Sequence, residues 1–157
     1  MNQKDCTSFQ EVYDFFLSVI TDDMFMEMTK EDTLECLEEI LLAALPHFEF
    51  PRQDIFNVDL LNKTFKCKLN FEEIRIIRSY MVVEWINYQL ASIDNVRQKY
   101  SGSDFSFTSQ ASHMDKLIKL RETYQTEGFH LQRLYCRRQK ESCGRYGSTF
   151  EKIMEVG

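Results

Sequence analysis

The sequence predicts a mainly α-helical protein, a helical bundle around a long central helix at about residues 70–97. The run from Asn70 to Arg97 contains no Pro or Gly and carries apolar residues at helical spacing. A capping residue followed three positions later by Glu, as in Ser8 with Glu11 and Asn70 with Glu73, marks helix starts. Five Gly and two Pro are too few for an all-β sandwich with many turns. A small β-hairpin or an extended arm is expected at about residues 47–69.

The central helix is expected to be buried on most of its circumference, because it carries two apolar stripes where a surface helix needs one. The first stripe is Ile74, Ile77, Met81, Trp85 and Tyr88, and the second is Ile76, Tyr80, Val83, Ile86, Leu90 and Ile93. Charged residues interrupt the run, so no apolar stretch of about 20 residues is left to cross a membrane. No membrane partner is therefore expected.

The 157 residues, of which 43% are hydrophobic, fit one domain with a real core. Residues 1–60 carry three Lys or Arg against fourteen Asp or Glu, a net charge of −11, whereas residues 61–157 carry sixteen against eleven, a net charge of +5. Such a split suits partners of opposite charge, and one such partner is a neighbouring copy of the same chain. No secretory signal is recognisable, and five Cys without a C-x-x-C pair indicate reduced thiols.

Two helices are expected in the acidic half, at about residues 8–21 and 30–45. The first opens at Ser8, and the second opens at Thr29 or Lys30 and ends before Pro46. The patch MFMEM between them either plugs the core or forms a pliable binding surface. The second helix carries early carboxylates that indicate a solvated or partner-facing surface: Glu31, Asp32, Glu35, Glu38 and Glu39.

Residues 46–69 alternate in hydropathy twice, at 48–50 and at 64–69, and the second stretch is the better strand. Leu61-Asn62-Lys63 precedes it as a turn. Phe65, Cys67 and Leu69 would then share one face, with Lys66 and Lys68 on the other. A two-stranded hairpin is marginal alone, so it must lean on the helices or on another subunit.

The loop at 98–110 combines turn residues with three aromatic residues, Tyr100, Phe105 and Phe107. These rings either tuck under the helices or dock into a neighbouring subunit. A helix from Thr108 or Ser109 follows. It ends either at about Thr126, before Gly128, or only after a continuation through Tyr135.

The C-terminal segment 129–157 is basic, with Arg133, Arg137, Arg138, Lys140 and Arg145 against one acidic residue between 129 and 147. RLYCRR interleaves Tyr135 with Arg, which suits phosphate contact and stacking, or an acidic protein surface. A short amphipathic tail then starts at Ser148 and needs a docking partner for stability. Its apolar residues are Phe150, Ile153 and Met154.

Signatures of catalysis and of cofactor binding are missing from the sequence. There is no phosphate-binding Gly motif, and His47, His113 and His130 are scattered outside any metal-binding frame. No serine-nucleophile signature is present. We therefore expect neither an enzyme nor a bound cofactor or metal.

Three phrases resemble small proteins from the structural gene block of tailed bacteriophages: residues 81–122, FHLQRLYCRRQK and STFEKIM. The chain resembles head-to-tail connector proteins, also called adaptor or head-completion proteins. The resemblance implies a mainly helical subunit of the phage neck that assembles as a ring, commonly of twelve copies, between the portal protein and the tail or stopper protein. Such a ring surrounds the DNA channel. The resemblance also implies that the protein is located in the virion, and in the bacterial host cytoplasm during assembly.

Within such a ring, the candidate contact residues would form three groups: residues that contact a partner or DNA, residues that contact a neighbouring subunit, and residues that dock on the portal. The basic segment with Tyr135 would contact a partner or the packaged DNA without sequence specificity. Subunit contacts would come from Tyr100, Phe105, Phe107, Phe65, Lys66 and Lys68, and portal docking from Phe150, Ile153 and Met154. The alternative is a small regulatory module that contacts nucleic acid or protein through its basic C-terminal segment.

Overall fold

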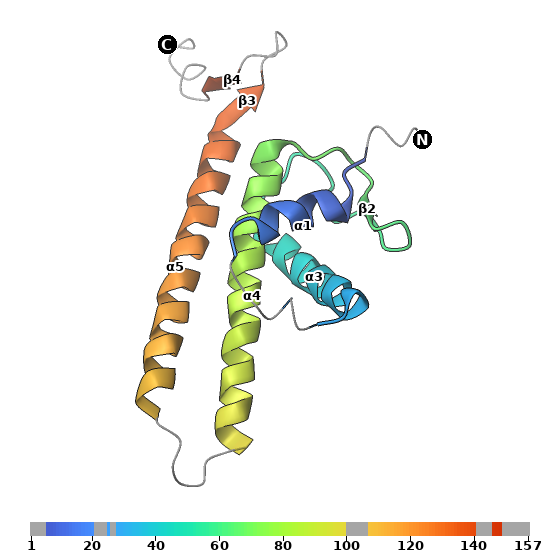
Figure 1. The fold of residues 1–157 in the computed structure, drawn as a ribbon. Coiled ribbons are helices and arrows are strands. Elements are labelled where there is room, and N and C mark those ends of the chain that lie inside the picture. Colours follow the sequence, from blue (N-terminus) through green and yellow to red (C-terminus); the bar gives the residue numbers. More distant parts are fainter. Residues whose placement is uncertain (1–5, 21–24, 26–27, 100–106, 141–145, 149–157) are drawn as a thin grey trace.

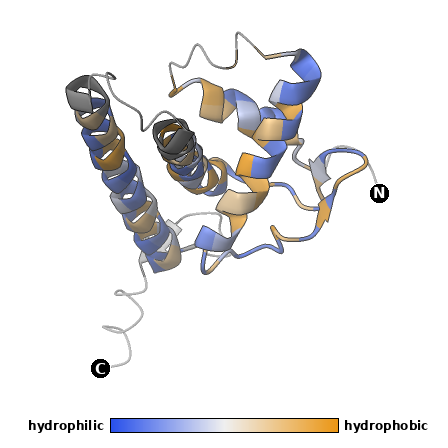
Figure 2. Ribbon diagram, turned by 90° about the horizontal axis from the view of Figure 1, so that it is seen from below, coloured by the Kyte–Doolittle hydropathy of each residue, from blue (hydrophilic) through white to orange (hydrophobic). Residues whose placement is uncertain are grey.

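The computed structural model describes residues 6–20, 25, 28–99, 107–140 and 146–148. The described chain is mainly helical, as predicted, with a small antiparallel hairpin between the helices (Figure 1). Helix α4 is the centre of the fold. Helix α5 lies along one side of it, and α1, α3 and the hairpin lie on the other (Figures 1 and 2).

The central helix α4 spans Phe71–Lys99 and starts with a complete capping box. The Glu73 N–H donates to Asn70 Oδ1 at 3.0 Å, and the Asn70 N–H donates to Glu73 Oε2 at 2.9 Å. From Ile74 to Ile86 the helix is buried on most of its circumference, because α1 and α3 cover one side and α5 the other. Beyond that point the first predicted stripe ends at Tyr88, which is exposed, whereas Leu90 and Ile93 of the second stripe are partly buried against the core. The lower part of α4 projects past α1 and α3 and packs on α5 (Figure 1).

The two N-terminal helices begin where predicted. Helix α1 spans Phe9–Leu17, with Ser8 Oγ accepting from the Glu11 N–H, and α3 spans Lys30–Ala44, with Thr29 Oγ1 accepting from the Asp32 N–H. Helix α1 ends four residues earlier than expected. The Ser18 hydroxyl donates to the Phe15 carbonyl at 2.8 Å, a local bond that competes with helix continuation. A 3₁₀ turn, η2 (Leu45–His47), follows α3 at Pro46.

The small hairpin consists of β1 (Val58–Asp59) and β2 (Thr64–Phe65), with Val58 opposite Phe65. The predicted turn at 61–63 is confirmed, but the strand at 64–69 is shorter than its alternation suggested, and 48–50 is not a strand. The alternation still sets burial, since Phe65 and Leu69 are buried while Lys66 and Lys68 are exposed.

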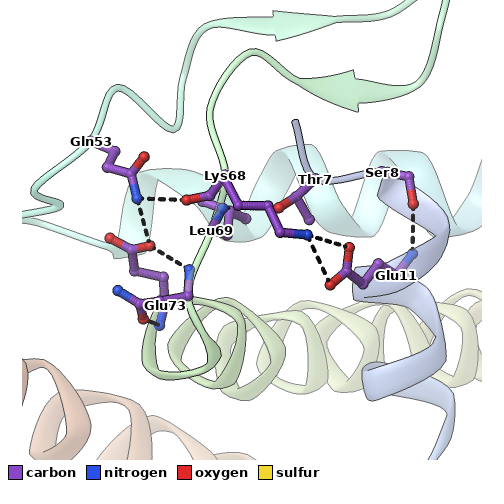
Figure 3. Close-up of polar contacts among 8 residues, drawn as sticks. Thr7, Ser8, Glu11, Gln53, Lys68, Leu69 and Glu73 are labelled. Carbon is purple, nitrogen blue, oxygen red and sulfur yellow. Dashed lines mark hydrogen bonds and ion pairs between the residues drawn. The ribbon is translucent and has the colours of Figure 1, made fainter. Parts of the chain in front are cut away.

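Residues 7–9 hold this hairpin against the helices. The Phe65 N–H donates to the Thr7 carbonyl, and the Phe9 N–H donates to the Lys63 carbonyl, both at 2.8 Å. Phe9 also packs edge-on against Phe65, with 5.2 Å between the ring centroids. On the same side, Thr7 Oγ1 accepts from the Leu69 N–H and Lys68 pairs with Glu11 (Figure 3). The hairpin therefore leans on its own chain.

Helix α5 spans Phe107–Arg137 without a break at Gly128, so the longer of the two predicted helices is confirmed. Gly128 is needed for packing rather than for a helix end. A Cβ on it would lie 2.9 Å from Cζ of Tyr80, so the glycine leaves room for the Tyr80 ring of α4 to pack against α5. Two short strands follow, β3 (Arg138–Lys140) and β4 (Tyr146–Ser148), paired antiparallel. Among the described helices, none is both long and apolar enough to cross a membrane.

Candidate functional site

The C-terminal third of α5 holds the segment 47–53 against α4, and this is where the candidate site forms. Gln132 is buried and makes three hydrogen bonds. Its amide nitrogen donates to the His47 carbonyl at 2.9 Å and to the Tyr80 hydroxyl at 2.6 Å, and its Oε1 accepts from the Glu49 N–H at 2.8 Å. The His47 ring stacks on Tyr80 and contacts Glu84, with 2.7 Å between Nε2 and Oε1. One side chain of α5 thus fixes both the segment and the central helix.

A second buried cluster forms around Glu73, which is 0% exposed. The Tyr135 hydroxyl donates to Glu73 Oε1 at 2.6 Å, and Gln53 Nε2 donates to Oε2 at 3.1 Å (Figure 3 shows the Gln53 contact). Together with the Asn70 N–H, these donors satisfy a carboxylate that would otherwise be costly to bury. The cluster ties α4, α5 and the 47–53 segment together.

Arg52 covers Tyr135 from the solvent side. Its guanidinium lies 4.0 Å from the centre of the Tyr135 ring and donates to the Tyr135 and Arg138 carbonyls. The backbone N–H of Arg52 donates to the Tyr135 hydroxyl. Tyr135 itself is 1% exposed and belongs to the core. The prediction that it contacts a partner or DNA is therefore corrected: the ring faces inward because it packs on Phe48 and supports Glu73.

Burial raises the pKa of Tyr135, and also that of Tyr80 and of Tyr13, where burial is in each case the leading cause. A tyrosine whose pKa is higher in the folded state stabilises the fold below the unfolded value of about 10 and ceases to do so as the pH rises through the folded value. We therefore expect the free energy of unfolding to fall as the pH increases above about 10. Urea denaturation at several alkaline pH values would measure this, and a free energy of unfolding that does not change above a pH of about 10 would contradict it.

Two adjoining hollows open on the surface between this segment and α5. One has a volume of about 480 Å³ and reaches down to Glu122. The other, the Phe50–Phe129 groove, has a volume of about 290 Å³ and is lined by Glu49, Phe50, Phe129, Gln132, Arg133, Cys136 and Arg137. Phe50 and Phe129 are 68% and 53% exposed. Exposed rings beside exposed arginines are typical of contact surfaces rather than of a solvated helix face.

The structure places the predicted basic residues in different environments. Arg133 and Arg137 are exposed at the groove, and the Arg133 guanidinium lies 5.8 Å from the centre of the Phe129 ring. Arg138 has left the helix and pairs with Glu72. Lys140 ends β3, and Arg145 lies outside the described residues. The groove thus brings together two of the five predicted cations.

Of the predicted subunit contacts, Phe65 is corrected: it is fully buried in its own chain, because it faces Phe9. Lys66 and Lys68 are exposed, and Lys68 pairs with Glu11 at 3.2 Å. Phe107 is the first residue of α5. The other predicted contacts lie outside the described residues: Tyr100, Phe105, Phe150, Ile153 and Met154.

Sequence reasoning missed Phe50, Phe129 and Gln132. Alternation at 48–50 suggested a strand, whereas Phe48 is buried and Phe50 points outward from an irregular segment. In the described part of the chain, no group of three or more His, Cys, Asp or Glu is arranged to hold a metal ion. No family model matches the sequence, and neither a curated protein nor a solved structure matches it.

Proposed function

We propose that the chain is a structural protein of the neck of a tailed bacteriophage, which forms a ring between portal and tail around the DNA channel. The proposal starts from the likeness of three sequence phrases to head-to-tail connector proteins. The second of these phrases, residues 129–140, contains Phe129, Arg133 and Arg137 of the groove.

The observation that carries the proposal is that unlike surfaces lie on opposite sides of α4 (Figures 1 and 2). On one side, α3 exposes Glu31, Asp32, Glu35 and Glu39. On the other, α5 exposes Arg133 and Arg137 beside two phenylalanine rings. Complementary patches on opposite sides favour head-to-tail contacts, which close into a ring when the rotation per subunit allows it.

Portal docking and DNA contact complete the proposed role. In the ring, Arg133 and Arg137 contact the acidic side of the neighbouring subunit, whereas the basic segment that follows α5 faces the portal protein or the packaged DNA, where phosphate contacts carry no sequence information. The tail at 149–157 is the proposed portal-docking segment.

The test is the assembly state of the purified chain, alone and mixed with the portal protein of the same phage. We expect rings, commonly of twelve subunits, in negative-stain images, and a matching species in sedimentation velocity. The double variant Arg133→Glu/Arg137→Glu should weaken ring assembly, whereas Lys119→Glu, which reverses an exposed charge elsewhere on α5, should leave assembly unchanged and serves as control. A chain that stays monomeric and shows no affinity for portal assemblies would refute the proposal.

A second candidate is a small regulatory module that binds nucleic acid. Arg133, Arg137 and the exposed Phe129 ring form a combination that suits a single strand, with stacking on the ring and phosphate contacts from the guanidinium groups. Binding should then weaken steeply with salt and be lost in the same double variant. Absence of any DNA or RNA mobility shift at low salt removes this candidate.

A further inference from the structure

The β1–β2 hairpin exposes an apolar tip at its turn. Leu61 is 95% exposed, and Leu60 next to it and Phe56 before β1 are about half exposed. Exposing several large apolar side chains to water is unfavourable, and such patches mark contact sites. The tip lies on the side of α4 away from α5 (Figures 1 and 2).

The turn is built to hold this tip in one conformation. Asp59 Oδ1 accepts from the N–H groups of Leu61 and Asn62, both at 3.0 Å, and the Asn62 side chain donates to Asp59 Oδ2 at 2.8 Å. Lys63 adopts a left-handed backbone with φ of 52°, and its ammonium pairs with Glu38 of α3 at 2.6 Å. A preordered apolar tip loses little conformational entropy on binding.

The groove on α5 is the matching surface. It is a hollow of about 290 Å³ between two exposed phenylalanine rings, Phe50 and Phe129, and it is large enough to receive a leucine side chain. Gln132 fixes the position of the groove, because its side chain is hydrogen-bonded both to the 47–50 segment and to Tyr80 of α4. The tip lies on the side of α4 away from α5, whereas α5 forms one wall of the groove, so the tip of a chain cannot fill its own groove (Figures 1 and 2).

We propose that the hairpin tip of one copy docks into the Phe50–Phe129 groove of a second copy. Charge complementarity supports a second copy as the occupant of the groove. Lys63 holds the tip beside α3, which exposes the acidic residues Glu35 and Glu39. The basic residues Arg133 and Arg137 border the groove. The contact is head-to-tail, because each copy offers one tip and one groove. It rests on the proposed function, since it names the contact between neighbouring subunits of the ring.

Two single variants and their mixture test the contact. Leu61→Asp removes the tip and leaves the groove, and Phe129→Asp removes the groove and leaves the tip. Each alone should weaken self-association at least about tenfold, as expected for a central apolar anchor. Mixed one to one, they retain one good tip and one good groove between them, so we expect a heterodimer in sedimentation velocity that neither variant forms alone.

Controls separate docking from misfolding. Leu120→Asp replaces a leucine of α5 that is 40% exposed and lies outside the groove, and it should leave assembly unchanged. Far-ultraviolet circular dichroism checks the fold, and Phe50→Asp replaces Phe129→Asp if the latter does not fold. Assembly that survives Leu61→Asp, or a mixture that yields no heterodimer, overturns the tip-in-groove contact.

The same measurements distinguish this inference from the proposed neck function. Wild-type rings that are insensitive to both variants would refute the tip-in-groove contact and leave the ring intact. Tip-dependent heterodimers from a chain that neither closes into rings nor binds portal would support the contact and refute the neck function. A wild type that remains monomeric at all concentrations, alone and with portal, refutes both.

Discussion

Replacing Glu73 with alanine is expected to lower the free energy of unfolding by about 3–5 kcal/mol. The variant removes the side chain that caps α4 and leaves the Asn70 N–H without its acceptor. It also removes the acceptor of the buried Tyr135 hydroxyl and one acceptor of Gln53. Because these groups are enclosed by the fold, water cannot take over the lost bonds without local opening.

The neighbouring carboxylate provides the control for this prediction. Glu72→Ala removes a partly exposed side chain that pairs with Arg138, in the same turn of the same helix. A pair of this kind contributes about 0–1 kcal/mol, so the loss should stay below about 1 kcal/mol. Urea denaturation followed by circular dichroism measures both variants. Equal losses for the two would show that the buried cluster does not stabilise the fold in the way argued above.

Gln132→Ala is expected to lower the free energy of unfolding by about 2–4 kcal/mol and to make the wall of the groove at 47–50 more mobile. The substitution leaves the Tyr80 hydroxyl, the His47 carbonyl and the Glu49 N–H without the amide that joins them. Since the amide links the 47–50 segment to α5, the effect should extend beyond stability. Hydrogen exchange of backbone amides at 47–50 should speed up well before global unfolding.

Gln125→Ala on the same helix is the matched control, because Gln125 is exposed and lines the larger hollow. The free energy of unfolding of the Gln125→Ala variant should differ from that of the wild type by less than about 0.5 kcal/mol. Hydrogen exchange of the backbone amides at 47–50 should stay as in the wild type. If Gln132→Ala unfolds globally without faster local exchange, the amide would stabilise the bundle as a whole and not this segment in particular.

Local signals in the sequence were sufficient for the helix starts. Caps such as Ser8 and Asn70 define helix starts through bonds to residues only three positions away. The double stripe of α4 predicted burial on both sides, and α1 with α3 on one side and α5 on the other provide it. The helix length was ambiguous at Gly128, because whether glycine ends a helix depends on what packs against it, and that is Tyr80, 48 positions earlier.

The candidate site was predicted less well, because it depends on contacts between distant segments. Arg133 and Arg137 were recognisable from charge alone. Tyr135 belongs to the same basic stretch, yet it is buried because Phe48, Arg52 and Glu73 surround it. No local pattern encodes those neighbours.

The sequence alone thus determined the mainly helical class, the helix starts and the split of charge, since each depends on residues within a few positions or on composition. The tertiary structure decided which large apolar and aromatic residues are exposed: Phe65 and Tyr135 face inward, whereas Phe50, Leu61 and Phe129 face outward. An apolar side chain is buried only if another segment covers it, and that cover comes from parts of the chain far away in sequence.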